Sequence, residues 1–138
     1  MDNARMIFVN LPVKDLATTR AFWEKVGFSF NPQFSDDHTA CLVISDTIYA
    51  MLMDEGRFRD FTRNEVADTA TTREAIIALS ATSRAEVDQL VESALGGGGS
   101  AVGETMDQGF MYGRAFLDPE GHHWEVVWMD PSAVEPTA

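Results

Sequence analysis

The stretch FLDPEGHHWEVVW, residues 116–128, contains two adjacent histidines and a glutamate two residues beyond the second. Histidine and glutamate are side chains that ligate metals and act as general acids or bases. The residues after the DPEG turn are typical of a strand, in which successive side chains point to opposite faces. His123 and Glu125 then share one face, whereas we expect His122 to be an exposed residue of the turn.

Glu125 is the strongest candidate for a catalytic group. Its neighbours in the strand are apolar, a setting in which a carboxylate is more typical of a pocket base or ligand than of a structural group. For His123, a place in the pocket and a purely structural role stay equally open. A metal held by His123 and Glu125 together would need a third ligand, and none is evident in the sequence.

A second set of candidates lies in FMYGRAF, residues 110–116, where Tyr112 and Arg114 alternate on one strand face. If that face lines a pocket, Arg114 can hold an anionic substrate group with its planar fork of donors, and Tyr112 can orient the substrate. Pairing of Arg114 with one of the many carboxylates is an equally good interpretation. Both alternatives stay open at the level of sequence.

Three further candidates for substrate binding lie in the N-terminal half. Phe8 and Asn10 share one face of the apolar run RMIFVNLPV, where Asn10 offers an amide to a pocket. Met51 lies in the run TIYAMLM, and its face is either the wall of a pocket or part of the core.

The elements that position these residues occur twice along the chain. In the first half, a strand over residues 5–13 precedes a helix over 16–26, which Asp15 caps and Gly27 ends, and three strand-like runs follow at 28–34, 39–45 and 47–53. In the second half, a strand over 75–81 precedes a helix that opens with the capping box Ser83 to Glu86 and ends at GGGG, residues 96–99, before strands around 100–105, 110–117 and 123–129.

This repetition predicts an α+β fold of two βαβββ modules. We expect one domain, with module one at about 5–54, a connector at about 55–74, module two at about 75–130 and a tail at 131–138. Two curved mixed sheets of this kind enclose a cleft, which is a natural pocket for a small molecule.

Composition excludes several functions. The net charge of −12 and pI near 4.4 argue against nucleic acid, whose binding depends on lysine and arginine. No apolar run approaches the roughly 20 residues that cross a bilayer, so we expect no membrane partner. Cys41 is the single cysteine, and the N-terminus lacks the pattern of a signal peptide, so we expect a cytoplasmic protein in which Cys41 is buried.

The motifs NLPVKDLATTRAFWEKVGF and FLDPEGHHWEVVW resemble the vicinal oxygen chelate superfamily, which contains glyoxalase I, extradiol dioxygenases, fosfomycin-modifying enzymes and bleomycin resistance proteins. FVNLPVKDL, GFMYGR and WEVVWMDP look like a bacterial subgroup labelled predicted lactoylglutathione lyase. Metal enzymes of the superfamily place four ligands, mostly histidine, glutamate or glutamine, on four strands. Matched to that pattern, the ligand positions here hold Phe8, Met51, Ile76 and Glu125.

Glu125 is therefore the one family ligand position retained, and one carboxylate does not hold a catalytic cation, which needs about three protein ligands. The resemblance leaves the cofactor undefined and argues against a divalent metal. It implies either a lactoylglutathione lyase-like lyase or isomerase that acts on a small oxygenated substrate, or a protein that binds an antibiotic or metabolite without chemistry. It also implies a homodimer.

Overall fold

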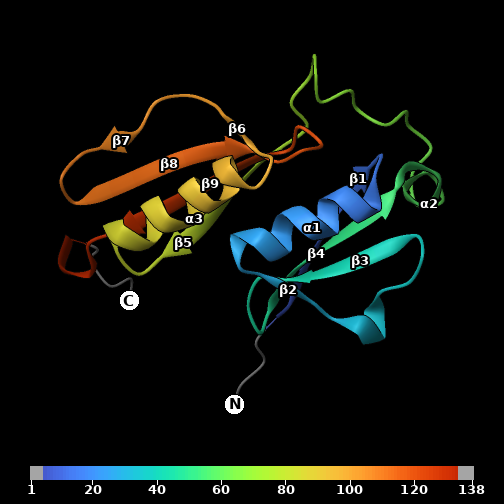
Figure 1. Cartoon of the computed structure of the whole chain (residues 1–138), viewed down its shortest axis with the longest axis horizontal. Helices are drawn as coiled ribbons and strands as arrows, with labels where there is room; N and C mark the ends of the chain where they lie inside the picture. The colour runs from blue at the N-terminus through green and yellow to red at the C-terminus, as the bar shows by residue number, and fades with distance from the viewer. Residues whose placement is uncertain (1–4, 134–138) are drawn as a thin grey trace. The chain divides into compact units, whose positions relative to one another are not determined.

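The computed structural model describes residues 5–133, which form two compact units that divide between Asp68 and Thr69. Each unit contains one mixed sheet and one long helix laid across it (Figure 1). The α+β class and the two mixed sheets predicted from the sequence are confirmed. The boundary between the units falls inside the predicted connector.

Unit 1 follows the predicted strand and helix order. Its sheet has the strand order β1-β4-β3-β2, in which β1 and β4 are parallel and the other pairs are antiparallel. The elements are β1 (Ile7–Val13), α1 (Leu16–Val26), β2 (Ser29–Phe30), a 3-10 turn (Pro32–Phe34), β3 (Thr39–Val43), β4 (Ile48–Asp54) and α2 (Glu55–Arg59).

Helix α1 begins and ends as its sequence predicts. The Asp15 carboxylate accepts the backbone N–H of Thr18 at 3.0 Å, and Gly27 takes a left-handed φ of 114° that stops the helix. The helix covers one face of the sheet with buried Phe22 and Trp23, and burial of each such side chain stabilises the fold by about 1.5–3 kcal/mol. The covered strand residues are Leu11, Val13, Ala40, Leu42, Ala50 and Leu52.

The run at 28–34 departs from the prediction, because only Ser29–Phe30 is a strand. Asn31 accepts the backbone N–H of Gln33 at 2.9 Å, and Pro32 then opens a 3-10 turn. Proline has no N–H to give to a strand ladder, and this explains why the strand stops there.

Unit 2 repeats the arrangement. Its sheet has the order β5-β9-β8-β6, with β5 parallel to β9 and a short additional strand β7 paired with β8. Helix α3 opens at Ser83, whose Oγ accepts the Glu86 N–H at 3.0 Å, and it packs on Phe116, Trp124 and Val126. The elements are β5 (Ile76–Ala81), α3 (Arg84–Gly96), β6 (Ser100–Ala101), β7 (Met106–Asp107), β8 (Met111–Leu117), β9 (His123–Met129) and a 3-10 turn (Pro131–Ala133).

The connector carries structure at both ends. Its first residues form α2, and residues 69–74 contact the turn between β8 and β9. The Thr69 hydroxyl donates to the Glu120 carbonyl at 2.6 Å, and the Arg73 guanidinium donates to the Gly121 carbonyl at 2.6 Å. Within residues 5–133, no helix has the length and apolar character needed to span a membrane. The predicted tail lies outside the described residues from position 134 onward.

Candidate functional site

Glu125 and His123 lie on the face of the unit 2 sheet that α3 does not cover. Glu125 pairs in register with Ala115 on β8 and Ala78 on β5, and its side chain is 41% exposed. The Nε2 atom of His123 lies 3.8 Å from Oε1 of Glu125, too far for a hydrogen bond, and it has no hydrogen-bond partner within the described chain. The structure therefore brings these two predicted residues together, with a buried imidazole nitrogen beside a partly exposed carboxylate.

A small pocket of about 80 Å³ adjoins Glu125. Its other walls are formed by Glu104, Met106, Gly113, Arg114 and Ala115. This volume is well below the roughly 300 Å³ at which ligand pockets begin. The pocket therefore has room for one polar group of a ligand beside Glu125 and not for a whole substrate.

Arg114 and Tyr112 point to the opposite face, toward α3. Arg114 pairs in register with Val126, a residue under α3, and its guanidinium forms ion pairs with Asp88 Oδ1 at 3.0 Å and with Glu92 Oε2 at 2.7 Å. The Tyr112 hydroxyl donates to Asp88 Oδ1 at 2.6 Å.

These contacts raise the pKa of Arg114, chiefly through Glu92, and lower the pKa of Asp88, chiefly through the Tyr112 hydroxyl. Arg114 thus lines the small pocket beside Glu125, but its guanidinium is held by Asp88 and Glu92, and Tyr112 does not line that pocket. Of the two alternatives for Arg114, the structure shows the pairing with carboxylates. The reason is strand alternation, which puts residues 112 and 114 on the same face as the buried Phe116.

The three candidates of unit 1 lie together on the sheet face opposite α1. Asn10 pairs in register with Met51, and Phe8 pairs with Tyr49. The Phe8 and Tyr49 rings are stacked, with centroids 5.1 Å apart and planes 11° apart, and Phe8 is 50% exposed. The Asn10 amide nitrogen donates to the Phe8 carbonyl at 3.1 Å, and the side-chain oxygen of Asn10 has no hydrogen-bond partner among residues 5–133. This face offers a planar aromatic surface with a thioether and an amide oxygen beside it.

The prediction that His122 is exposed was wrong, since its exposed fraction is 1%. Its Nδ1 lies 2.8 Å from Glu74 Oε1, and its backbone N–H donates to Asp118 Oδ1 at 3.0 Å. Asp118 also accepts the indole N–H of Trp124 at 3.0 Å, and burial raises the pKa of its carboxyl. Residues 69–74 cover the turn, and this long-range contact is what the local sequence around His122 does not reveal.

The four positions that the sequence resemblance matches to metal ligands do not carry a set of side chains that fits a divalent cation. Phe8 and Ile76 have no donor atom, and the thioether of Met51 is a poor ligand for the hard or borderline cations concerned. Among the residues of the described range, no three histidine, cysteine, aspartate or glutamate side chains are grouped so that they could hold a metal ion. The side chains at these positions therefore do not form a site for a divalent metal.

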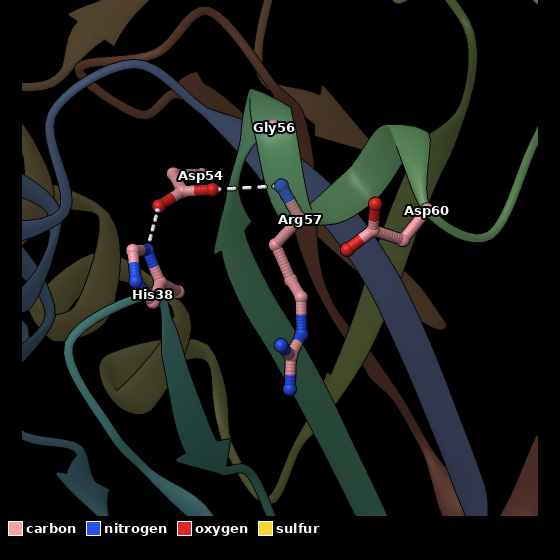
Figure 2. Close-up of a pocket in the computed structure, with 5 residues that line it drawn as sticks. All are labelled: His38, Asp54, Gly56, Arg57 and Asp60. Atoms are coloured by element: carbon pink, nitrogen blue, oxygen red, sulfur yellow. Dashed lines mark hydrogen bonds and ion pairs between the residues drawn. The ribbon is translucent and has the colours of Figure 1, made fainter.

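Sequence reasoning missed a pocket of about 460 Å³ in unit 1, which lies within the size range of small-molecule sites. Figure 2 shows the residues that line it: His38, Asp54, Gly56, Arg57 and Asp60. His38 Nδ1 lies 2.6 Å from Asp54 Oδ2, although the two residues are far apart in sequence. The register of the β3–β4 hairpin could have revealed this pair. Thr39 pairs with Met53, and one step further along the same register His38 lies opposite Asp54.

Comparisons with known proteins agree with this architecture. The hypothetical protein SA1046 from S. aureus is 25% identical, with a TM-score of 0.76 over 92% of this chain and 95% of that one. A glyoxalase/bleomycin resistance protein/dioxygenase family enzyme from Burkholderia phytofirmans PsJN is 17% identical, with a TM-score of 0.76 over 91% and 99%.

The fosfomycin resistance protein FosX from Listeria monocytogenes is 21% identical, with a TM-score of 0.66 over 99% of this chain and 97% of that one. No curated protein matches the chain. Residues 5–126, however, match the model of one family over most of the chain's length. The chain therefore belongs to the Glyoxalase/Bleomycin resistance protein/Dioxygenase superfamily.

Proposed function

We propose that this chain binds an organic small molecule without a resident divalent metal. The observation that carries the proposal is the set of side chains at the family's ligand positions, in which Phe8, Met51 and Ile76 are apolar and accessible. Exposed apolar side chains on a sheet face favour a ligand with an aromatic or aliphatic body over a hydrated cation.

The face of unit 1 that carries Phe8, Tyr49 and Asn10 supports one kind of ligand. A flat ring placed on the Phe8 and Tyr49 stack gains offset stacking, which contributes about 0.5–1.5 kcal/mol beyond the buried area. The unused amide oxygen of Asn10 accepts one hydrogen bond from the ligand and orients it. We therefore expect a planar, largely apolar molecule with at least one hydrogen-bond donor, as in many antibiotics and aromatic metabolites.

A second candidate function is a lactoylglutathione lyase-like isomerisation, favoured by the position of Glu125 beside His123. In that reaction the carboxylate takes a proton from the carbon next to a carbonyl and returns it to the neighbouring carbon. The enediolate formed between the two transfers needs a positive group, and the guanidinium of Arg114 is engaged with α3 on the other face. Binding without chemistry is for this reason the preferred proposal.

The test is a thermal-shift screen of aromatic antibiotics and metabolites, in which a compound that binds the folded state raises the melting temperature. Phe8→Ala should abolish the stabilisation by a hit. Phe34 is also an exposed phenylalanine of unit 1, and Phe34→Ala should retain the stabilisation. Retention in both variants, or a shift with nickel or zinc that a chelator reverses, would contradict metal-free binding at this face.

Chemistry is tested in the same preparation. Turnover of a mixture of glutathione and methylglyoxal that disappears in Glu125→Gln, and survives in Glu104→Gln on the same pocket rim, would favour the isomerase.

We also propose a cytoplasmic homodimer. The resemblance supports the dimer, and the single buried Cys41 supports the cytoplasm. Sedimentation velocity measures the assembly state.

A further inference from the structure

The pocket lined by His38, Asp54, Gly56, Arg57 and Asp60 contains an imidazole held in one orientation. Asp54 Oδ2 lies 2.6 Å from Nδ1 of His38, and the backbone N–H of Asp54 donates to the His38 carbonyl at 2.9 Å. The second ring nitrogen, Nε2, has no partner among residues 5–133, and the His38 side chain is 64% exposed. His38 therefore presents Nε2 to solvent and to any ligand.

Arg57 supplies a second cationic group to the same pocket. Its backbone N–H is used by Asp54 Oδ1 at 2.8 Å, whereas its guanidinium forms no ion pair or hydrogen bond within the described residues. Arg59 on the same helix differs, because Glu55 neutralises it at 3.5 Å. In Figure 2 the Arg57 side chain extends between His38 and Asp60.

Donors of the same unit engage the carboxylate of Asp54 and one oxygen of Asp36. Both oxygens of Asp54 are engaged, by His38 and by the Arg57 N–H, and Asp36 Oδ1 accepts the backbone N–H groups of His38 and Thr39 at 2.8 and 2.9 Å. Asp60 is the further carboxylate on the pocket wall. The pocket therefore offers two groups that have no hydrogen-bond partner among residues 5–133, the Arg57 guanidinium and the Nε2 atom of His38, whose Nδ1 is paired with Asp54.

We propose that this pocket is a second ligand site, which holds the carboxylate or phosphate group of a small molecule between the His38 imidazolium and the Arg57 guanidinium. The planar fork of Arg57 suits a bidentate contact to such an oxyanion, and Nε2 of His38 adds a charge-assisted hydrogen bond. Asp60 accepts a hydroxyl or amino hydrogen of the same molecule.

The site is separate from the ligand face of the proposed function. Alternation along β4 directs Asp54 to the side of Leu52, which α1 covers, and directs Met51 to the opposite side. Binding of an oxyanion at the pocket therefore does not depend on Phe8. The variant Phe8→Ala should leave it unchanged.

Affinity at this site depends on pH through His38. Its hydrogen bond to Asp54 raises the pKa of His38, and Asp36 and Asp37 in the preceding loop raise it further. The other charged groups that face it are Arg57 and Asp60. Because the folded-state pKa is raised above the ordinary value, His38 carries its charge below that pKa and loses it as the pH rises through it. Oxyanion affinity should fall over that interval.

The experiment is an amide NMR titration of the full chain with sulfate, which keeps its charge across the pH range, and separately with acetate. At about pH 5.5, well below a raised histidine pKa, we expect saturable shifts at residues 38 and 54–60. Saturation by sulfate marks a phosphate-bearing ligand, and saturation by acetate marks a carboxylate. At a pH above the raised pKa of His38, and in Arg57→Gln or His38→Asn at the lower pH, affinity should fall at least tenfold.

The matched control is Arg59→Gln, which removes a charge two residues away on the same helix and should leave affinity unchanged. Asp54→Asn should move the pH midpoint of binding downward, because it removes the group that raises the pKa of His38. Shifts that do not saturate, or an equal loss in Arg57→Gln and Arg59→Gln, would overturn the proposal in favour of general charge screening.

Discussion

At the scale of single residues, the buried carboxylate of Asp118 organises the turn between β8 and β9. Its two oxygens accept the backbone N–H groups of Glu120 and His122 and the indole N–H of Trp124. Burial raises the pKa of Asp118, and the three hydrogen bonds and the nearby His122 act in the opposite direction by stabilising the carboxylate. The side chain of Asp118 therefore fixes the turn, and the turn positions β9 and Glu125 on it.

Replacing Asp118 with alanine should destabilise the protein by about 3 kcal/mol, because two buried donors and one part-buried donor lose their acceptor together. Asp118→Asn should cost less, since the amide retains one acceptor oxygen. Urea denaturation measures both. Asp46→Ala, which removes a surface carboxylate with no side-chain contact in the described chain, serves as the control and should change stability by less than about 0.5 kcal/mol. A cost for Asp118→Ala as small as that of the control would contradict this role.

For single residues, the sequence predicts some positions in the candidate sites and not others. Alternation correctly put His123 with Glu125 and Phe8 with Asn10, because it follows from strand geometry alone. It does not say which face the helix covers. For Arg114 that information was present in the hairpin register, which pairs it with Val126, an apolar residue one step from Glu125. His122 required a contact with Glu74, 48 residues away, which no local pattern contains.

At the scale of elements, caps and stops were the most predictable features. Asp15, Gly27 and Ser83 each satisfy backbone groups within a few residues, so their roles can be inferred from sequence. The connector was less predictable, because its last residues are held by tertiary contacts. Thr69 and Arg73 donate to the backbone of the turn, and this fixes residues 69–74 against Gly121.

Gly121→Ala should release this contact. Gly121 has a φ of +84°, and a Cβ there would lie 2.5 Å from Thr69 Oγ1 and 3.0 Å from Thr69 Cβ. We expect a loss of about 2–3 kcal/mol and faster amide hydrogen exchange at residues 69–74. Gly109→Ala separates the two causes, because Gly109 has a similar φ of +81° and no atom within 4 Å of an added Cβ.

The control should therefore cost only the backbone strain, about 1 kcal/mol, with no change in exchange at 69–74. Equal losses in the two variants would show that contact with Thr69 contributes nothing.

At the scale of the whole molecule, charge is the property that the sequence determines most directly. The chain carries 22 acidic and 10 basic residues, for a net charge of −12. Self-repulsion of this excess opposes the compact state. Ion pairs such as those of Arg84 with Asp107 and Arg114 with Glu92 act in the opposite direction, but partly exposed pairs contribute about 0–1 kcal/mol each. The balance of the two effects decides how salt acts on stability.

Raising sodium chloride from about 10 mM to about 150 mM shortens the screening length from about 30 Å to about 8 Å. Repulsion between distant carboxylates is then largely removed, whereas ion pairs at about 3 Å are weakened far less. We therefore expect the melting temperature to rise by several degrees at constant pH, as measured by thermal denaturation. A melting temperature that falls with added chloride would show that ion pairs outweigh the repulsion.

Sodium sulfate at matched ionic strength should raise the melting temperature further if the oxyanion site of unit 1 is filled. The variant Arg57→Gln should lose that extra increase while retaining the effect of chloride.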